Sequence, residues 1–315
     1  MLSRRLLRVK VMQIMYSYNQ NNENDLKLAS NELLRSVSKS YELYNLILLL
    51  MLELKLLAEK RIEIGKNKRM PTPEELNPNT KFIDNLLLNQ LSENEDLLRY
   101  IDATGLSWTQ DPEFIVEIYN EVIKSDLYLA YMAEETTSYD ADRRFLVKLV
   151  EKVIGQYLPL YSLFEDMSIW WNDESEFIVS MIIKTFKEFN QANAEKHRLL
   201  KPIDFNDKDS DSDVNFIKTL LEKSILNRDK YNELIKKYSI NWEHERVSVM
   251  DTILMHIALT EIIEFPLIPL KVTLNEYIEI AKHYSTPKSG TFINGILDKI
   301  AEHLIKEEQI TKYEK

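Results

Sequence analysis

Glycine is scarce in this chain, which has only five glycines in 315 residues. Glycine supplies the tight turns of sheet-rich proteins and the close backbone approach of phosphate-binding loops, so both kinds of fold usually contain more of it. Leucine, isoleucine, glutamate, lysine and asparagine are frequent instead, and these residues are typical of helices joined by short polar turns. We therefore expect an all-α protein, long enough for two domains or for one elongated domain.

Apolar residues recur at helical spacing through most of the chain. Residues 3–20 should form the first helix, with Leu7, Val11 and Ile14 on its core face. A long helix or helix pair is expected over 26–64, and the prolines that follow it indicate an irregular connection. Further helices are predicted over 80–100, 112–133, 142–164, 173–198, 214–237, 243–264, 273–284 and 289–309. The expected N-caps among the later helices are Asp213, either Thr273 or Asn275, and Ser289.

The middle of the chain contains an internal repeat. A shift of 71 residues, without gaps, aligns 145–189 with 216–260. The matched pairs include Phe145 with Phe216, Leu149 with Leu220, Ser168 with Ser239, Trp171 with Trp242, and Ile182 with Ile253. The repeated unit consists of a helix, a turn containing Ser-Ile-x-Trp and a second helix, which predicts a duplicated helical hairpin. The alternative is that amphipathic helices simply resemble one another.

The residue types that catalysis and cofactor binding require are missing or scattered. The chain has no cysteine, which excludes disulfides, thiol catalysis and zinc–thiolate sites and fits a reducing cytoplasm. No nucleotide-binding or nucleophile motif occurs, and the alternating aspartates of 207–213 lack the glycine and glutamate of a calcium loop. We therefore predict a binding protein with no enzymatic activity, no cofactor and no metal site.

The distribution of charge predicts contact with an anion at one end of the molecule. The net charge of −11 argues against a surface that coats nucleic acid, yet residues 1–20 contain four basic residues and no acidic one. Such a basic tip favours local contact with an anionic partner. No segment reaches the roughly 20 apolar residues that span a bilayer, and the N-terminus lacks the pattern of a signal peptide. We expect a cytoplasmic protein that does not bind membranes.

Arg4, Arg5 and Arg8 lie within the first two turns of the first predicted helix. A planar guanidinium group donates paired hydrogen bonds to phosphate, and the positive end of the helix adds to the attraction. Gln13 could read the edge of a base, and Tyr16, about 20° from Arg5 around the helix, could stack on an unpaired base. The alternative is a solvated basic helix end with Tyr16 packed in the core.

Four segments together resemble the NusB family of transcription antitermination factors. They are RRLLRVKVMQIMYSY over 4–18, the stretch from Trp242 to Glu261, NEYIEIAK over 275–282 and TFINGILD over 291–298. The resemblance implies an all-α, NusB-like helical bundle. It also implies that the protein binds boxA-type single-stranded RNA together with ribosomal protein NusE. With them it would join the antitermination complex on RNA polymerase during ribosomal RNA transcription.

The resemblance also assigns roles to individual residues by their position in the motifs. RNA contact falls on Arg4, Arg5, Arg8, Gln13, Tyr16, Lys288, Ser289 and Phe292, and contact with NusE falls on Asp251 and Arg246. Some family members have an acidic residue at the position of Lys288, so a lysine there should strengthen phosphate contact. For Arg246 a structural salt bridge is an equal alternative to contact with NusE. Trp242 is expected to anchor the start of its helix in the core and not to contact a partner.

The chain is more than twice as long as is usual in that family. Residues 1–64 and 211–315 match the bundle, and 65–210 is predicted to be a helical insertion made partly by the hairpin duplication. One alternative function is a NusB-like protein–protein interaction module without RNA binding. A second is an RNA cytosine methyltransferase, which needs a glycine-rich methyl-donor domain and a catalytic cysteine, and the sequence contains neither.

Overall fold

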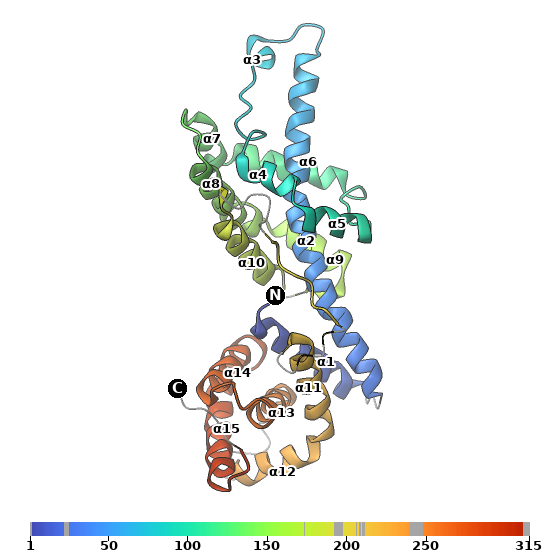
Figure 1. The fold of residues 1–315 in the computed structure, drawn as a ribbon, viewed down its shortest axis with the longest axis vertical. Coiled ribbons are helices and arrows are strands. Elements are labelled where there is room, and N and C mark those ends of the chain that lie inside the picture. Colours follow the sequence, from blue (N-terminus) through green and yellow to red (C-terminus); the bar gives the residue numbers. More distant parts are fainter. Residues whose placement is uncertain are drawn as a thin grey trace. The chain divides into compact units, whose positions relative to one another are not determined.

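The computed structural model of the chain describes residues 2–21, 25–172, 174–191, 198–205, 207, 209, 212–239 and 248–310. Within these residues the regular secondary structure is entirely helical, with no strand (Figure 1). The all-α fold that the scarcity of glycine predicts is therefore confirmed. Over the same residues, no helix has both the length and the apolar character needed to cross a membrane.

The described helices form two compact units. Unit 1 consists of Met1–Ser38 and Pro202–Lys315, and unit 2 consists of Lys39–Lys201. The first boundary lies inside the 41-residue helix α2 (Leu26–Lys66), whose helical pattern continues without a break, so the sequence offers no signal for it. The functional division of the chain at 64/65 and 210/211 stays a prediction.

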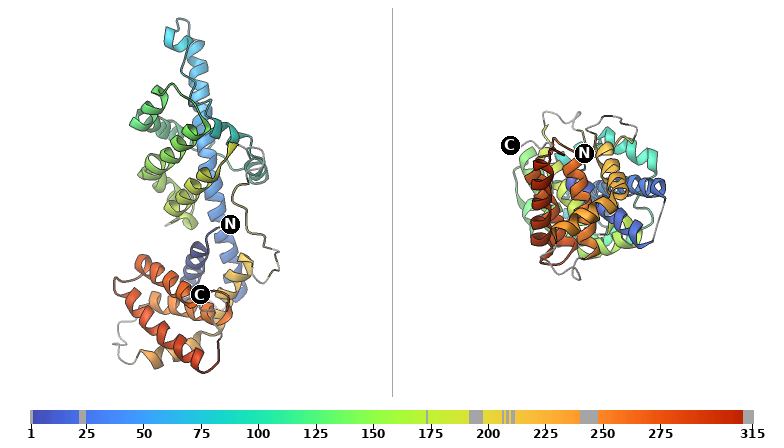
Figure 2. Two further views of the ribbon diagram at one scale, coloured as in Figure 1. Left: turned by 60° about the vertical axis from the view of Figure 1, so that its left-hand side comes forward. Right: turned by 90° about the horizontal axis from the view of Figure 1, so that it is seen from below.

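Unit 1 is built around helix α13 (Val249–Glu264). Every residue of this helix from Ile253 to Ile262 is buried, which is the expected outcome for a sequence that is apolar nearly all round. The helices that pack against it are α1 (Arg4–Gln20), α11 (Asp213–Leu226), α12 (Arg228–Tyr238), α14 (Leu270–Tyr284) and α15 (Ser289–Lys306) (Figure 2). The two ends of the chain therefore meet in one core.

Unit 2 contains the remainder of α2 and a series of shorter helices. These are α3 (Pro73–Leu76), α4 (Leu86–Ser92), α5 (Glu95–Thr104), α6 (Pro112–Lys124), α7 (Asp126–Ala133), α8 (Tyr139–Lys152), α9 (Leu158–Met167) and α10 (Ser175–Glu188). Trp108, in the loop between α5 and α6, is 2% exposed, stacks on Phe114 and donates its indole Nε1–H to the carbonyl of Leu46 at 3.0 Å. This loop is thereby fixed to α2.

Several helices predicted as continuous are each two helices in the structure. In two of these segments the break falls at a residue that begins a new helix by capping it. Asn94 accepts hydrogen bonds from two backbone amides at the start of α5, and Ser125 accepts one at the start of α7. The segment 80–100 therefore contains α4 and α5, and 112–133 contains α6 and α7. The predictions for 142–164 and 214–237 were also wrong, because each contains two α-helices, although no side chain caps the second helix there.

Two of the predicted N-caps were also wrong. Ser212, and not Asp213, caps α11, since its Oγ accepts the hydrogen bond from the amide of Asn215 at 3.2 Å. Helix α14 begins at Leu270, so both Thr273 and Asn275 lie inside the helix, and Thr273 is fully buried. The side chains of Asp213 and Thr273 are used instead in contacts with other helices, which are described below.

The two halves of the internal repeat fold into helices in the same order. The first half forms α8, α9 and α10, and the second forms α11, α12 and α13. Helix α8 packs on α10, and α11 packs on α13. The matched residues Phe145 and Phe216, Leu149 and Leu220, and Ile182 and Ile253 are all buried. This agreement supports a duplicated hairpin; Trp242, the partner of Trp171 in the repeat, lies outside the described residues.

Candidate functional site

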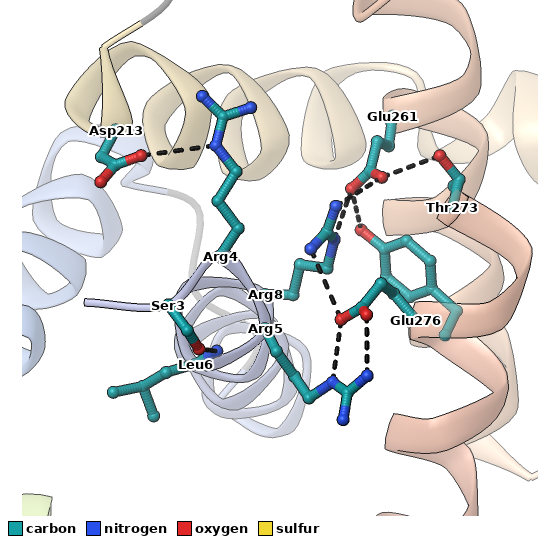
Figure 3. Close-up of polar contacts among 10 residues, drawn as sticks. Ser3, Arg4, Arg5, Leu6, Arg8, Asp213, Glu261, Thr273 and Glu276 are labelled. Atoms are coloured by element: carbon teal, nitrogen blue, oxygen red, sulfur yellow. Dashed lines mark hydrogen bonds and ion pairs between the residues drawn. The ribbon is translucent and has the colours of Figure 1, made fainter. Parts of the chain in front are cut away.

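The predicted arginine cluster lies at the start of α1. Ser3 caps this helix by accepting a hydrogen bond from the amide of Leu6 at 3.2 Å, so helical geometry begins at Arg4. Arg4, Arg5 and Arg8 then project from the first two turns toward α11, α13 and α14 (Figure 3). Each of the three guanidinium groups has a carboxylate partner on one of those helices.

Arg8 forms the most buried of these ion pairs. Its Nε and Nη2 donate to the two carboxylate oxygens of Glu261 at 2.7 and 2.8 Å, and the side chains are 4% and 0% exposed. Glu261 also accepts hydrogen bonds from the hydroxyls of Thr273 at 2.8 Å and Tyr277 at 3.1 Å. Burial works to lower the pKa of Arg8, but hydrogen bonding to Glu261 and the nearby negative charges raise it above its usual range. Arg8 is therefore a charged anchor inside unit 1.

Arg5 forms a similar paired contact at the surface. Its Nε and Nη2 donate to Glu276 at 2.9 and 2.7 Å, with the arginine side chain 49% exposed and the glutamate 19% exposed. The second oxygen of Glu276 also lies 3.6 Å from Nη1 of Arg8. Hydrogen bonding from Arg5 lowers the pKa of Glu276 despite its partial burial. Glu276 is thus shared between two arginines.

Arg4 makes the weakest of the three contacts. Its Nε lies 3.4 Å from Oδ1 of Asp213, and its guanidinium lies over the ring of Phe216, 4.7 Å from the ring centre. The arginine side chain is 41% exposed. The Arg4 side chain is therefore partly exposed, with one face of its guanidinium against the Phe216 ring of α11.

The remaining residues predicted on α1 lie further along the helix. Gln13 is half-buried, and Tyr16 is 41% exposed, so the alternative that Tyr16 belongs to the core is wrong. From Arg5 to Tyr16 the helix rises about 16 Å. A ligand that touched both would have to extend along α1 over that distance.

A second group of predicted residues lies at the start of α15. Lys288 is exposed, whereas Ser289 is 2% exposed and Phe292 is 8% exposed. Ser289 is the first residue of the helix and not its N-cap, so that prediction was wrong. Its hydroxyl faces backwards along the chain, where it accepts a hydrogen bond from the amide of Thr286 at 3.2 Å and shares another with Ser285 at 3.0 Å.

Asp251, the predicted partner-binding residue, joins this second group. It is 4% exposed, and its carboxylate accepts a hydrogen bond from the hydroxyl of Ser285 at 2.6 Å. Its amide donates to Ser248, the N-cap of α13, at 3.0 Å. Asp251 therefore ties the start of α13 to the end of α14. Arg246, the other predicted partner residue, lies outside the described residues.

Replacing Asp251 with alanine should lower the free energy of unfolding by about 1–3 kcal/mol, because a hydrogen bond to a buried carboxylate is lost. Chemical denaturation of the wild type, Asp251→Ala, Ser285→Ala and the double variant measures this. The two single losses should not add, since both remove the same bond. Fully additive losses would show that the carboxylate stabilises the fold through other contacts.

The two groups of predicted residues are separate in space along α14. Glu276, beside the arginines, and Ser285, beside Ser289, are nine residues apart, which corresponds to about 13 Å along the helix. The structure therefore brings Arg4, Arg5 and Arg8 together and places Asp251 with Ser289, but it does not merge the two groups into one site.

The carboxylates that hold the arginines were the part of the site that sequence reasoning missed. Glu261 carried a usable signal, because it is a carboxylate near the end of the largely apolar stretch from Ile253 to Ile262. A carboxylate on such a buried helix requires a cation or several hydrogen bonds. Across the described residues, no three His, Cys, Asp or Glu side chains are grouped as a metal site requires.

Comparisons with known proteins agree with the resemblance of the motifs. The model of the NusB family matches residues 175–302. The transcription antitermination protein NusB of Salinibacter ruber is 34% identical over 141 residues, which cover 44% of this chain and 86% of that protein. The protein of the same name from Desulfatibacillum aliphaticivorans is 44% identical over 97 residues, covering 31% of this chain and 68% of that protein.

A solved structure of T. maritima NusB is also similar in sequence. It is 26% identical, and the alignment covers 53% of this chain and 95% of that one, with a TM-score of 0.26. This low score describes a poor overall superposition of the two folds.

Proposed function

Because the chain belongs to the NusB family of transcription antitermination factors, we propose that it binds boxA-type single-stranded RNA together with ribosomal protein NusE. In this role it joins the antitermination complex on RNA polymerase during ribosomal RNA transcription, in the cytoplasm. The protein contributes binding surfaces and performs no chemistry, and this holds for the helices of unit 2 as well.

The observation that supports RNA binding most directly is the half-exposed pair Arg4 and Arg5 at the start of α1. Guanidinium groups in this setting donate hydrogen bonds to phosphate oxygens. Tyr16 presents an exposed aromatic ring on the same helix, and single-stranded RNA is bound by stacking its bases on such rings. Gln13 lies between them, and Lys288 adds an exposed cation before α15.

In this proposal Arg8 has a supporting role, and not the direct RNA contact that the sequence pattern predicts. In the described conformation its guanidinium is occupied by Glu261 and buried, so it supports the RNA surface by fixing α1. Ser289 and Phe292 are likewise buried and support the loop that presents Lys288. Contact with NusE is proposed at Asp251, at the start of α13, and at Arg246, which lies outside the described residues.

The double variant Arg4→Ala/Arg5→Ala should bind a boxA-type single-stranded RNA roughly tenfold or more weakly than the wild type at low salt. Fluorescence anisotropy over a range of salt concentrations measures this. Two fewer phosphate contacts should also reduce the slope of log affinity against log salt by about 1.4. Loss of affinity without a change in slope would contradict a phosphate-binding role for these arginines.

A matched control removes the same charge from unit 2. Arg99 and Lys124 are exposed and, like Arg4 and Arg5, ion-paired, although their carboxylate partners lie on their own helices. The variant Arg99→Ala/Lys124→Ala should leave RNA affinity nearly unchanged. An equal loss in both double variants would show that net charge, and not the surface at α1, controls binding.

One observation favours the alternative of a protein-interaction module without RNA binding. All three arginines at the start of α1 are already paired with carboxylates of the same chain. On that alternative, the wild type binds NusE in a pull-down but shows no affinity for boxA-type RNA even at low salt. The same anisotropy experiment therefore decides between the two functions.

A further inference from the structure

We propose that Glu276 competes with an RNA phosphate for Arg5. The phosphate binds Arg5 by taking the place of the Glu276 carboxylate. The proposal rests on the RNA-binding function proposed above. It gives Glu276 a role in setting RNA affinity, in addition to its part in holding α1 against α14.

The geometry of the Arg5–Glu276 pair is the first reason. Nε and Nη2 of Arg5 each donate to one oxygen of Glu276, at 2.9 and 2.7 Å. This is the two-pronged arrangement in which arginine also binds phosphate, and it uses the same edge of the guanidinium. A phosphate that approaches Arg5 in this way must replace Glu276.

The second reason is the difference in burial between the Arg5 and Arg8 pairs. Arg8 and Glu261 are 4% and 0% exposed, and Glu261 is held by two further hydroxyl groups, so opening that pair would leave charges buried. Arg5 is 49% exposed, and ion pairs in such positions contribute little to stability. Of these two paired contacts, only the one at Arg5 can therefore open at small cost.

The third reason is that Glu276 keeps a positive neighbour when Arg5 is withdrawn. One of its oxygens lies 3.6 Å from Nη1 of Arg8, which is its second cation. Two other charges act on Arg5, namely that of Glu279, which lies on α14 with Glu276, and that of Arg8. Glu279 is itself paired with Lys282. Glu276 can therefore remain ionised beside Arg8 while Arg5 turns to a phosphate.

This arrangement selects for ligands that carry an oxyanion. A base edge or a backbone carbonyl offers no charge with which to displace a carboxylate from a guanidinium, whereas a phosphodiester does. Glu276 therefore lowers the affinity of Arg5 for every ligand, but least for one that places a phosphate at the start of α1.

The test is the variant Glu276→Gln, which keeps the shape of the side chain and one hydrogen-bond acceptor but removes the charge. Its affinity for a boxA-type single-stranded RNA should be roughly fivefold higher than that of the wild type at low salt, the scale of an exposed ion pair. In an Arg5→Ala background the same substitution should change affinity little. Unchanged or weaker binding by Glu276→Gln would overturn the proposal.

Glu279→Gln is the matched control, because it removes the same charge from the same helix without freeing an arginine. If it tightens binding as much as Glu276→Gln, a general charge effect is responsible and the proposal fails. If the wild type binds RNA through Arg5 and Glu276→Gln binds no more tightly, only this proposal fails. If neither the wild type nor Glu276→Gln binds RNA, the proposed function fails with it.

Discussion

Replacing Arg8 with alanine is expected to lower the free energy of unfolding of unit 1 by about 3–5 kcal/mol. The substitution removes the arginine partner of the fully buried carboxylate of Glu261, which still accepts hydrogen bonds from the neutral hydroxyls of Thr273 and Tyr277. An uncompensated charge in a core costs far more than the loss of an exposed ion pair. Hydrogen exchange of peptides from α13 and α14, measured by mass spectrometry, reports this loss within unit 1.

Arg5→Ala is the comparison for that measurement, because Arg5 lies one turn earlier on α1 and also binds a glutamate through two hydrogen bonds. Its exposed pair should contribute no more than about 1 kcal/mol. Equal losses of protection in the two variants would contradict the anchoring role of Arg8. Removing both charges, in Arg8→Met/Glu261→Leu, should restore part of the stability that Arg8→Ala loses.

Replacing Trp108 with alanine is expected to lower the free energy of unfolding of unit 2 by about 3–5 kcal/mol. The indole is 2% exposed, packs against Phe114 and Phe164, and donates to the carbonyl of Leu46. Its removal leaves a large cavity beside α2 and frees the loop between α5 and α6. Hydrogen exchange of peptides from α2 and α6 measures the loss of stability in the part of unit 2 that surrounds Trp108.

Trp108→Phe separates the packing of the ring from its hydrogen bond. Phenylalanine fills most of the space but cannot donate to Leu46, so its loss should be near the 1–2 kcal/mol of a hydrogen bond and a small volume change. A loss as large as that of the alanine variant would show that the bond from the indole, and not the filling of the core, holds the loop.

The helical class could be predicted because it depends on local information. Scarce glycine and apolar residues at helical spacing were sufficient for the class and for the positions of most helices. Helix ends were less predictable, because residues such as Asn94 and Ser125 also occur inside helices and their capping role depends on the backbone around them. The boundary at Ser38 was not predictable at all, since α2 continues through it.

Of the candidate site, only the basic residues could be predicted from the sequence. Arg4, Arg5 and Arg8 are neighbours along one helix, so their grouping follows from the sequence. Their partners come from helices more than 200 residues away, and a single sequence contains no direct record of such long-range pairs. The sequence therefore suggests that all three arginines are available for a ligand, whereas in the structure each is already paired with a carboxylate. The partial exposure of Arg4 and Arg5 distinguishes them from the buried Arg8.

The separation of Arg8 from its partner along the chain has a consequence for how the protein is made. Arg8 is synthesised 253 residues before Glu261. At translation rates of roughly 5–20 residues per second, the interval lasts roughly 10–50 s. All of Lys39–Lys201 has been added by then. The nascent chain therefore carries α1 without the carboxylates of α13 and α14 throughout that interval, and unit 1 can close only after those two helices have been made.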